Sequence, residues 1–286
     1  MRCLSVADAL TSLGADVSFI LSDSNSVELI ESRGFATVVL DSDWRHIEDG
    51  TDDLCRICDG AEIPIVLVDT YSVTREYVDC LAQHAKICYL GSKGGDLGNL
   101  SLLANYSTCI DEAFYEEIYG NRGTKLLFGP KYAPLRPCFA EAYRECSAKI
   151  ERVLVTTGNT DPQGFIPAFL ASALSDERLS NVTFTAVVGR MVSDDVTAKV
   201  NLIGSRSSRV TVLRAVTDMA GLMSQCDAAV SANGTTVYEL FAAGLPSVTF
   251  AMVEEQVQSA ESLAELGAVE YCGLIGDGPH TTVAES

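Results

Sequence analysis

The sequence predicts an α/β protein made of two Rossmann-like, doubly wound domains that face each other across a cleft. Short apolar runs of strand length alternate with amphipathic helical patterns, as is typical of parallel sheets covered by helices on both faces. The alternation stops around residues 122–147, where glycine and proline cluster, and then resumes. A chain of 286 residues also has room for two domains. We therefore predict an N-terminal domain over 1–125, a linker over 126–147 and a C-terminal domain over 148–286.

In the N-terminal domain, an amphipathic helix is expected at the very start of the chain. Strands are then predicted over residues 17–21, 36–40, 63–68 and 87–90. The helices predicted between them cover residues 26–33, 48–59 and 74–85. Because the strands are nearly continuous apolar runs, we expect both faces of the sheet to be buried.

In the C-terminal domain the same alternation runs to the end of the chain. Strands are predicted over residues 153–157, 182–188, 210–213, 228–231 and 247–251, with a short one near 269. The predicted helices cover residues 163–174, 194–200, 218–225, 235–243 and 256–265. This repeated βα order predicts a second parallel sheet with ligand-binding loops at the carboxyl ends of its strands.

The composition excludes several classes of partner. With 20 basic and 39 acidic residues the formal net charge is −19, which would repel nucleic acid and anionic lipid. A small anionic ligand is still possible, because amides at a helix N-terminus bind phosphate without any lysine. No apolar run approaches the length of a membrane span, and no signal peptide is recognised. We expect a cytoplasmic protein, with its oligomeric state left open.

The ten cysteines predict neither disulfides nor a metal site. Most lie inside apolar segments, where free cysteine packs as a small hydrophobe. The single CxxC motif, Cys55 to Cys58, lacks the second pair of ligands that zinc requires, and the only histidines are His46, His84 and His280. We therefore expect no metal and no other cofactor.

The first candidate ligand site follows the strand over residues 153–157. The chain turns there through Gly158, Asn159 and Thr160, and Pro162 is expected at the first position of the next helix. A glycine lets the backbone approach a phosphate closely, and the two polar side chains add donors. An ordinary βα turn explains this pattern equally well.

The second candidate site is more specific. A buried strand ends at Ser231, Asn233 and Gly234 form the turn, and Thr235 or Thr236 is expected to cap the following helix. Glu239 lies one turn further, where a carboxylate can accept hydrogen bonds from both hydroxyls of a ribose. Glu239 also suits the first turns of a helix electrostatically, which is the structural alternative. Together these residues point to a nucleotide.

Five stretches of the chain match one family in order. They are residues 1–10, the Asp-x-Tyr that ends at Tyr71, the Gly-Pro-Lys-Tyr-Ala-Pro-Leu-Arg of 129–136, the Thr-Gly-Asn-Thr-Asp-Pro of 157–162 and the Ser-Ala-Asn-Gly-Thr-Thr-Val-Tyr-Glu of 231–239. Through these motifs nearly the whole chain resembles the UDP-sugar hydrolases of pseudaminic acid biosynthesis and the related spore-coat polysaccharide proteins. That family is similar to GT-B glycosyltransferases of the MurG type.

The resemblance implies hydrolysis of a UDP-linked diacetamido sugar. In the family a histidine of a Gly-His motif supports attack by water, assisted by a tyrosine, here Tyr71, and an asparagine. The asparagine position is Glu255 here, beside Gln256, and the Gly-His motif would fall just upstream of Met1. We therefore expect the N-terminal domain to lack its first strand and the catalytic histidine. This is what a truncated gene start would produce.

These considerations give the predicted site residues and leave three functions open. The predicted catalytic residues are Tyr71 and Glu255. The predicted nucleotide-binding residues are Gly158, Asn159, Thr160, Arg214, Val216, Asn233, Gly234, Thr235, Thr236, Glu239 and Gln256. The leading function is a UDP-sugar hydrolase of nonulosonate or surface polysaccharide biosynthesis. The alternatives are a GT-B glycosyltransferase with a UDP-sugar donor and a non-catalytic nucleotide-sugar-binding protein. An NAD enzyme is disfavoured, because no GxGxxG follows a strand.

Overall fold

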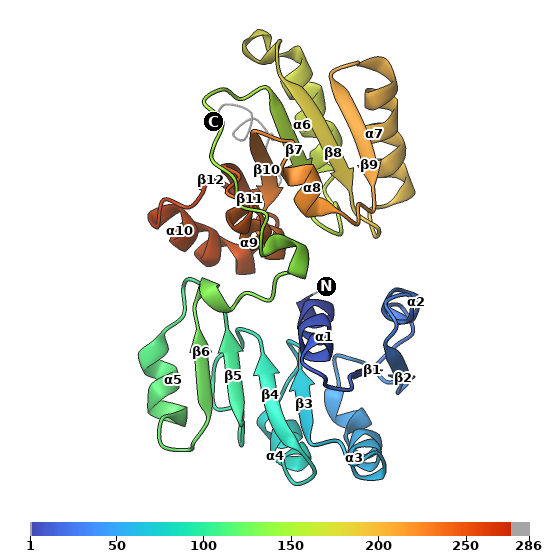
Figure 1. Ribbon diagram of the computed structural model, residues 1–286, viewed down its shortest axis with the longest axis vertical. Coiled ribbons are helices and arrows are strands. Elements are labelled where there is room, and N and C mark those ends of the chain that lie inside the picture. The colour runs from blue at the N-terminus through green and yellow to red at the C-terminus, as the bar shows by residue number, and fades with distance from the viewer. Residues whose placement is uncertain (1, 276–286) are drawn as a thin grey trace. The chain divides into compact units, whose positions relative to one another are not determined.

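The computed structural model describes residues 2–275, so His280 lies outside the described residues. The chain divides into two compact units, Met1–Pro134 and Leu135–Ser286. The boundary falls inside the segment expected to be the linker. Every strand pairing described is parallel (Figure 1). The prediction of two α/β units with parallel sheets is confirmed.

The N-terminal unit contains two parallel sheets, one with the order β3-β4-β5-β6 and one that pairs β1 with β2. The strands are Ser18–Leu21 (β1), Ala36–Val39 (β2), Ile65–Val68 (β3), Lys86–Leu90 (β4), Leu102–Asn105 (β5) and Lys125–Phe128 (β6). The helices are Arg2–Ser12 (α1), Val27–Glu31 (α2), Thr51–Gly60 (α3), Arg75–Leu81 (α4) and Glu112–Tyr119 (α5), with the 3-10 turn Ile47–Gly50 (η1).

Each sheet of this unit has its own apolar core. The larger core joins α3, α4 and α5 to the four-stranded sheet, and Leu81, Ile87 and Leu103 in it are fully buried. Cys55 and Cys58 of the CxxC motif belong to this core, as structural packing predicts. The smaller core lies between α1, α2 and the two-stranded sheet.

Three elements of the N-terminal unit are not predicted by the sequence pattern: β5, α5 and β6. Both strands have four residues, of which three in a row are apolar, whereas the equally short β3 lies in the longer apolar stretch of residues 63–68. β6 lies within residues 122–147, where the pattern predicts no regular structure. Its pairing with β5 at the edge of the sheet explains why so short a run becomes a strand.

The N-terminal sheet is divided between β1 and β3. Within residues 2–275, β1 pairs only with β2, and β3 pairs only with β4. β1 and β3 therefore each have one edge with no neighbouring strand among the described residues, as do β2 and β6 at the other sides of the two sheets.

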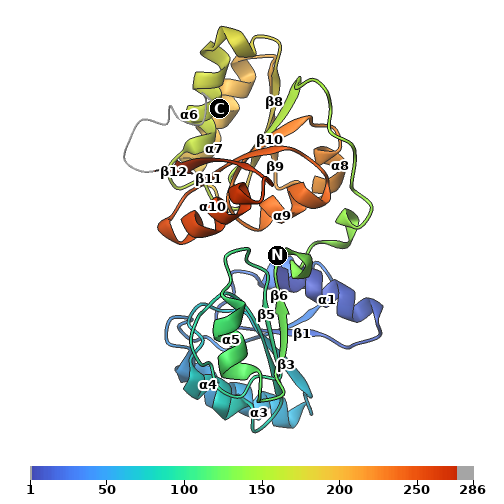
Figure 2. The same ribbon diagram turned by 90° about the vertical axis from the view of Figure 1, so that its left-hand side faces the viewer.

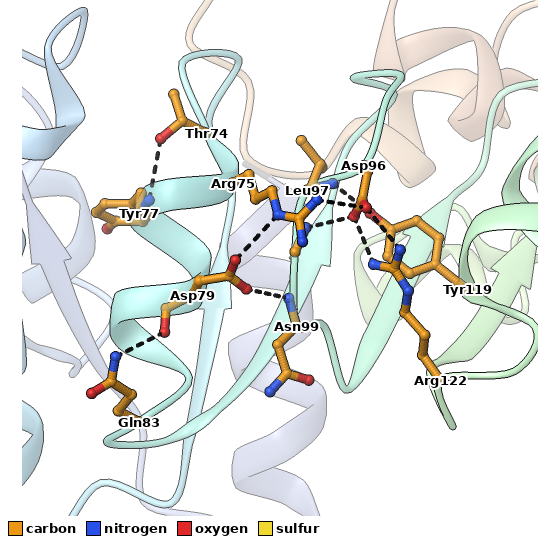
Figure 3. Close-up of polar contacts among 11 residues, drawn as sticks. Thr74, Arg75, Tyr77, Asp79, Gln83, Asp96, Leu97, Asn99, Tyr119 and Arg122 are labelled. Carbon is orange, nitrogen blue, oxygen red and sulfur yellow. Dashed lines mark hydrogen bonds and ion pairs between the residues drawn. The ribbon is translucent and has the colours of Figure 1, made fainter.

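The connection from β4 to β5 crosses the sheet without a helix. Parallel strands usually need a helical crossover, but here the loop of residues 91–101 takes that place. Leu97 and Leu100 of the loop are buried in the core of the sheet. The backbone N–H of Leu97 donates to the Tyr119 hydroxyl at 2.7 Å, which anchors the loop to α5 (Figure 3).

Charged side chains hold the outside of this loop (Figure 3). Asp96 accepts two hydrogen bonds of 2.7 Å from the guanidinium of Arg122 and one of 3.0 Å from Arg75. Asp79 of α4 accepts from Arg75 at 3.3 Å and from the backbone N–H of Asn99 at 2.8 Å. The network joins α4, the loop and the turn before β6.

Replacing Asp96 with asparagine is expected to lower the melting temperature of the chain by roughly 2–4 °C at neutral pH. The hydrogen bonds from Arg122 lower the pKa of Asp96 from 3.8 to about 2. Because the folded-state pKa lies below the unfolded-state value, this stabilisation is complete above about pH 4 and is lost as the pH falls from about 4 to about 2.

Thermal unfolding of both proteins across this pH range checks the prediction. The difference between the original chain and Asp96→Asn should shrink towards acid pH. Asp53→Asn is the matched control, because Asp53 pairs with Arg56 on an exposed face of α3. A difference between Asp96→Asn and the original chain that does not change with pH would contradict the assignment.

The C-terminal unit has one six-stranded sheet with the order β12-β11-β10-β7-β8-β9 (Figure 1), and helices cover both of its faces (Figure 2). The strands are Arg152–Thr156 (β7), Thr183–Val188 (β8), Val210–Arg214 (β9), Ala228–Ala232 (β10), Ser247–Ala251 (β11) and Glu270–Leu274 (β12). The helices are Phe165–Ser175 (α6), Asp194–Arg206 (α7), Met219–Met223 (α8), Thr235–Ala242 (α9) and Val257–Glu265 (α10). The 3-10 turns are Pro130–Tyr132 (η2) before this unit, and Pro137–Phe139 (η3), Glu177–Leu179 (η4) and Glu254–Gln256 (η5) within it.

The sheet is buried on both faces. Val153 and Val155 of β7 belong to the core formed with α6 and α7. Leu154, between them, belongs to the core formed with α8, α9 and η3. Successive residues of a strand point to opposite faces, so the apolar run of β7 supplies both cores, as expected for a doubly wound sheet.

Strand order reverses between β7 and β10. β8 and β9 extend the sheet on one side of β7, whereas β10, β11 and β12 extend it on the other. In open α/β sheets the loops at such a switch point diverge and leave a crevice at the carboxyl ends of the strands. The two candidate motifs lie at the ends of these two strands.

Several helix boundaries differ from the sequence pattern, among them those of α4, which ends at Leu81 and not at residue 85, and of α6 and α7. α6 begins at Phe165, so Pro162 precedes the helix and does not occupy its first position. α7 continues to Arg206, well past the expected end at residue 200. In the described part of the chain no helix is long and apolar enough to span a membrane.

Candidate functional site

The loops after β7 and β10 lie side by side. A Cβ built on Gly158, after β7, would lie 4.0 Å from the hydroxyl oxygen of Thr236 in α9. Gly158 has a φ of +82°, which favours glycine. The structure therefore brings together residues from the two motifs that the sequence analysis treats separately.

The loop after β7 is held against the end of β8. Gly158 N–H donates to the Thr156 hydroxyl at 3.1 Å, and the Asn159 carbonyl accepts from Met191 N–H at 3.1 Å. A Cβ on Gly189, just after β8, would lie 2.3 Å from the Gly158 carbonyl oxygen and 2.4 Å from that of Asn159. Only glycine at 189 permits this approach, so the backbone of Gly158 and Asn159 is fixed by packing.

The N-terminus of α6 is capped by the chain itself. The carboxylate of Asp161, which is 2% exposed, accepts from the backbone N–H groups of Phe165 at 2.8 Å and Ile166 at 3.0 Å. The sequence motif suggests that this helix end faces a ligand, but these two amides already have a charged acceptor. A phosphate near this loop would instead meet the backbone and side chains of residues 158–160.

The N-terminus of α9 is open. Gly234 is its N-cap and has no side chain to cap the helix, and Thr235 and Thr236 occupy the first two helical positions. The prediction that a threonine caps α9 is therefore wrong. A Cβ on Gly234 would meet nothing within 4 Å. Uncapped amides beside open space form the arrangement that binds phosphate at a helix N-terminus.

Asn233 and Gln256 close the neighbouring loops. The buried Asn233 side-chain amide donates to the Gln256 carbonyl at 3.1 Å, and the Gln256 side chain accepts from Met252 N–H at 2.8 Å. These bonds join the loop before α9 to the loop before α10. Glu255 lies in η5 beside them and is exposed.

Glu239 lies in α9 and forms an ion pair with Arg136 of the connecting segment, residues 129–151 between β6 and β7. Arg136 donates from Nε at 2.9 Å and from Nη2 at 3.0 Å to the two carboxylate oxygens, and from Nη1 to the Thr217 carbonyl at 3.3 Å. Only 15% of the Arg136 side chain and 12% of the Glu239 side chain are exposed. The carboxylate therefore has a fixed orientation.

The end of β9 contributes the other predicted residues. Arg214 is exposed at the last position of β9, and Val216 is half-buried against the core below α8. Ala215 between them has a φ of +50°, and its N–H donates to the Val188 carbonyl at 3.2 Å. The left-handed backbone at Ala215 bends the chain between β9 and Thr217.

Tyr71 and Asp69 belong to the N-terminal unit, at the carboxyl end of β3. Tyr71 is 72% exposed. Asp69 accepts from the Arg2 guanidinium at 2.9 Å and from the Cys3 thiol at 2.8 Å, and Arg2 also donates to the Tyr106 hydroxyl at 2.9 Å. Burial opposes ionisation of Asp69, but the Arg2 hydrogen bonds outweigh it and lower the pKa of this carboxyl.

Three residues of the site region are absent from the predicted set. Arg136 and Asp161 lie inside quoted motifs, but their roles depend on partners that sequence spacing does not reveal. Thr157 ends the β7 motif, and its buried hydroxyl oxygen has no hydrogen-bond partner among the described residues. Thr157 directly precedes the glycine turn at the carboxyl end of β7, and this position in the sequence indicates a site residue. Within residues 2–275, no group of three or more histidine, cysteine or acidic side chains is placed to hold a metal ion.

Comparison with known proteins identifies relatives of the chain, although no family model matches it. The spore coat polysaccharide biosynthesis protein SpsG of Bacillus subtilis is 29% identical over 177 residues, which make up 59% of the chain and 51% of SpsG. The uncharacterized protein MJ1062 of Methanocaldococcus jannaschii is 21% identical over 266 residues, 89% of the chain and 53% of that protein. The chain thus spans about half the length of each relative.

Solved structures resemble the chain over almost its whole length. The spinosyn rhamnosyltransferase SpnG matches with a TM-score of 0.62 and 13% identity, covering 100% of the chain and 85% of SpnG. MurG of Acinetobacter baumannii matches with a TM-score of 0.59 and 16% identity, covering 95% of the chain and 82% of MurG. The chain is an SpsG homologue with a GT-B fold. The resemblance to the spore-coat polysaccharide proteins and to GT-B glycosyltransferases is confirmed.

Proposed function

We propose that this SpsG homologue binds a UDP-sugar at the carboxyl edge of its C-terminal sheet and acts in polysaccharide biosynthesis. One arrangement carries the proposal: the open N-terminus of α9, beside Gly158, with the Glu239 carboxylate one turn further along the same helix. Phosphate and ribose are neighbours in a nucleoside diphosphate, and this spacing offers a group suited to each.

Different residues of the site suit different parts of the nucleotide. The amides of Thr235 and Thr236 suit the diphosphate, because they combine free donors with the positive end of the helix dipole. Gly158 to Thr160 suit its other side, and Glu239 suits the ribose hydroxyls. The loop from Arg214 to Val216 is the part of the site that we assign to the uracil ring. Since these donors include backbone amides at a helix N-terminus, the site can bind an anion without any basic residue.

The reaction that we propose is hydrolysis of a UDP-linked diacetamido sugar, as the sequence motifs imply. Bound N–H donors stabilise the leaving diphosphate, and a general base activates the attacking water. Glycosyl transfer is the second candidate, favoured by the structural likeness to the glycosyltransferases SpnG and MurG. SpsG is described as a spore coat polysaccharide biosynthesis protein, which supports the process but not the choice of reaction.

Glu239→Ala is expected to weaken UDP binding by about 1–3 kcal/mol, roughly 5- to 150-fold, through lost ribose hydrogen bonds. Isothermal titration calorimetry with UDP measures this directly. Glu265→Ala, which removes an exposed carboxylate from the end of α10, should leave the affinity unchanged. Equal UDP affinity in Glu239→Ala and the original chain would remove Glu239 from the site.

Measuring UDP release during incubation with a UDP-diacetamido sugar distinguishes hydrolysis from glycosyl transfer. UDP released in the absence of an acceptor supports hydrolysis. UDP released only when an acceptor sugar is added supports transfer, and tight binding without release supports a binding protein. No binding of UDP or of the sugar nucleotide would overturn the proposed function as a whole.

A further inference from the structure

Arg136 has no role in the binding scheme above, yet it contacts the residue assigned to the ribose. Its guanidinium makes two parallel hydrogen bonds to the two oxygens of Glu239. Such a bidentate pair fixes the plane of a carboxylate, whereas a single contact leaves it free to rotate. Both side chains are mostly buried, so solvent does not replace this contact easily.

The pair leaves Glu239 able to bind a ligand. Each carboxylate oxygen can accept two hydrogen bonds, and Arg136 uses one on each. One acceptor position on each oxygen therefore remains for a ligand hydroxyl. Arg136 also keeps the buried carboxylate paired with a positive charge before any ligand arrives, which avoids the penalty of an isolated buried anion.

Two further contacts hold the guanidinium in place. Its Nη1 donates to the carbonyl of Thr217, which directly follows Val216. The Cζ atom of Arg136 lies 5.2 Å from the centre of the Phe139 ring. Phe139 is buried in the core beneath α8 and α9. Arg136 thus connects the ribose carboxylate, the loop assigned to the base and the core of the unit.

We propose that Arg136 is a positioning residue that orients Glu239 towards the ribose diol and sets a preference for ribonucleotides over 2′-deoxyribonucleotides. This inference rests on the proposed function. It assigns the preference for ribonucleotides to Arg136, a residue of the connecting segment. A merely structural pair would support folding but would not distinguish the two kinds of sugar.

The experiment compares UDP with 2′-deoxy-UDP by calorimetry on the full chain. The original chain is expected to bind UDP roughly 10- to 100-fold more tightly, the value of a hydrogen bond to a charged acceptor. Arg136→Met should reduce this preference to less than about 3-fold, and Arg136→Lys should give an intermediate value. The matched control is Arg152→Met, which breaks the pair with Asp227 at the start of β7 and should keep the full preference.

The outcomes separate the two proposals. Equal weakening of both nucleotides by Arg136→Met, with the preference unchanged, overturns the role of Arg136 and leaves UDP binding intact. So does an original chain that binds both nucleotides equally well. If the original chain binds neither nucleotide, the proposed function fails and this inference fails with it. Arg136→Lys, which keeps the positive charge, decides the question if Arg136→Met does not fold.

Discussion

Replacing Phe139 with alanine is expected to lower the free energy of unfolding of the C-terminal unit by about 3–5 kcal/mol. Phe139 is 3% exposed and packs with Leu154 of β7, Met219 of α8 and Leu240 of α9. Its ring also lies beneath the Arg136 guanidinium. Alanine would leave a cavity between the connecting segment and two helices, and the rigid sheet below them cannot collapse to fill it.

Chemical denaturation followed by circular dichroism measures this loss. Leu202→Ala is the control, because it removes a large apolar side chain that is 49% exposed on α7 and should cost less than about 1 kcal/mol. If both variants lose the same small amount, the connecting segment does not contribute to the core as described.

Replacing Gly189 with alanine is expected to cost about 3 kcal/mol of stability, the upper end for overpacking, and to weaken UDP binding at least about 10-fold. The added Cβ would lie within 2.4 Å of two backbone carbonyl oxygens, those of Gly158 and Asn159. Backbone atoms cannot rotate away as a side chain can. The loop after β7 must therefore move, and it would carry its donors away from the N-terminus of α9.

Unfolding and UDP titration are measured on the same preparation. Gly60→Ala serves as the control, since a Cβ at the end of α3 meets nothing within 4 Å, and both quantities should stay unchanged. A Gly189→Ala protein that is less stable but binds UDP normally would show that the loop after β7 does not contribute to binding.

Local sequence pattern is enough to predict most of the architecture. The five-residue strands β7 and β11 are almost entirely buried, and the pattern places them correctly. It fails for β5 and β6, whose four-residue runs become strands only because a neighbouring strand pairs with them. It also misplaces the start of α6, since the capping carboxylate of Asp161 acts from outside the helix.

The candidate site is less predictable, because its decisive contacts are distant in sequence. Gly158 and Thr236 are brought together by the pairing of β7 with β10. Arg136 and Glu239 are separated by 103 positions. Turn residues at strand ends indicate where a ligand binds, but no spacing rule reveals that a linker arginine contacts a helix carboxylate.

The connecting segment also provides a mechanical link. Arg136 follows Pro134, the last residue of the N-terminal unit, by two positions, and it holds Glu239 directly. Further along, Arg144 donates its N–H to the Ala243 carbonyl just after α9 and its guanidinium to the Ser224 carbonyl. Leu135, between Pro134 and Arg136, packs against the core of the C-terminal unit. Any tension that reaches the chain at Pro134 therefore acts on both this core and the carboxylate assigned to the ribose.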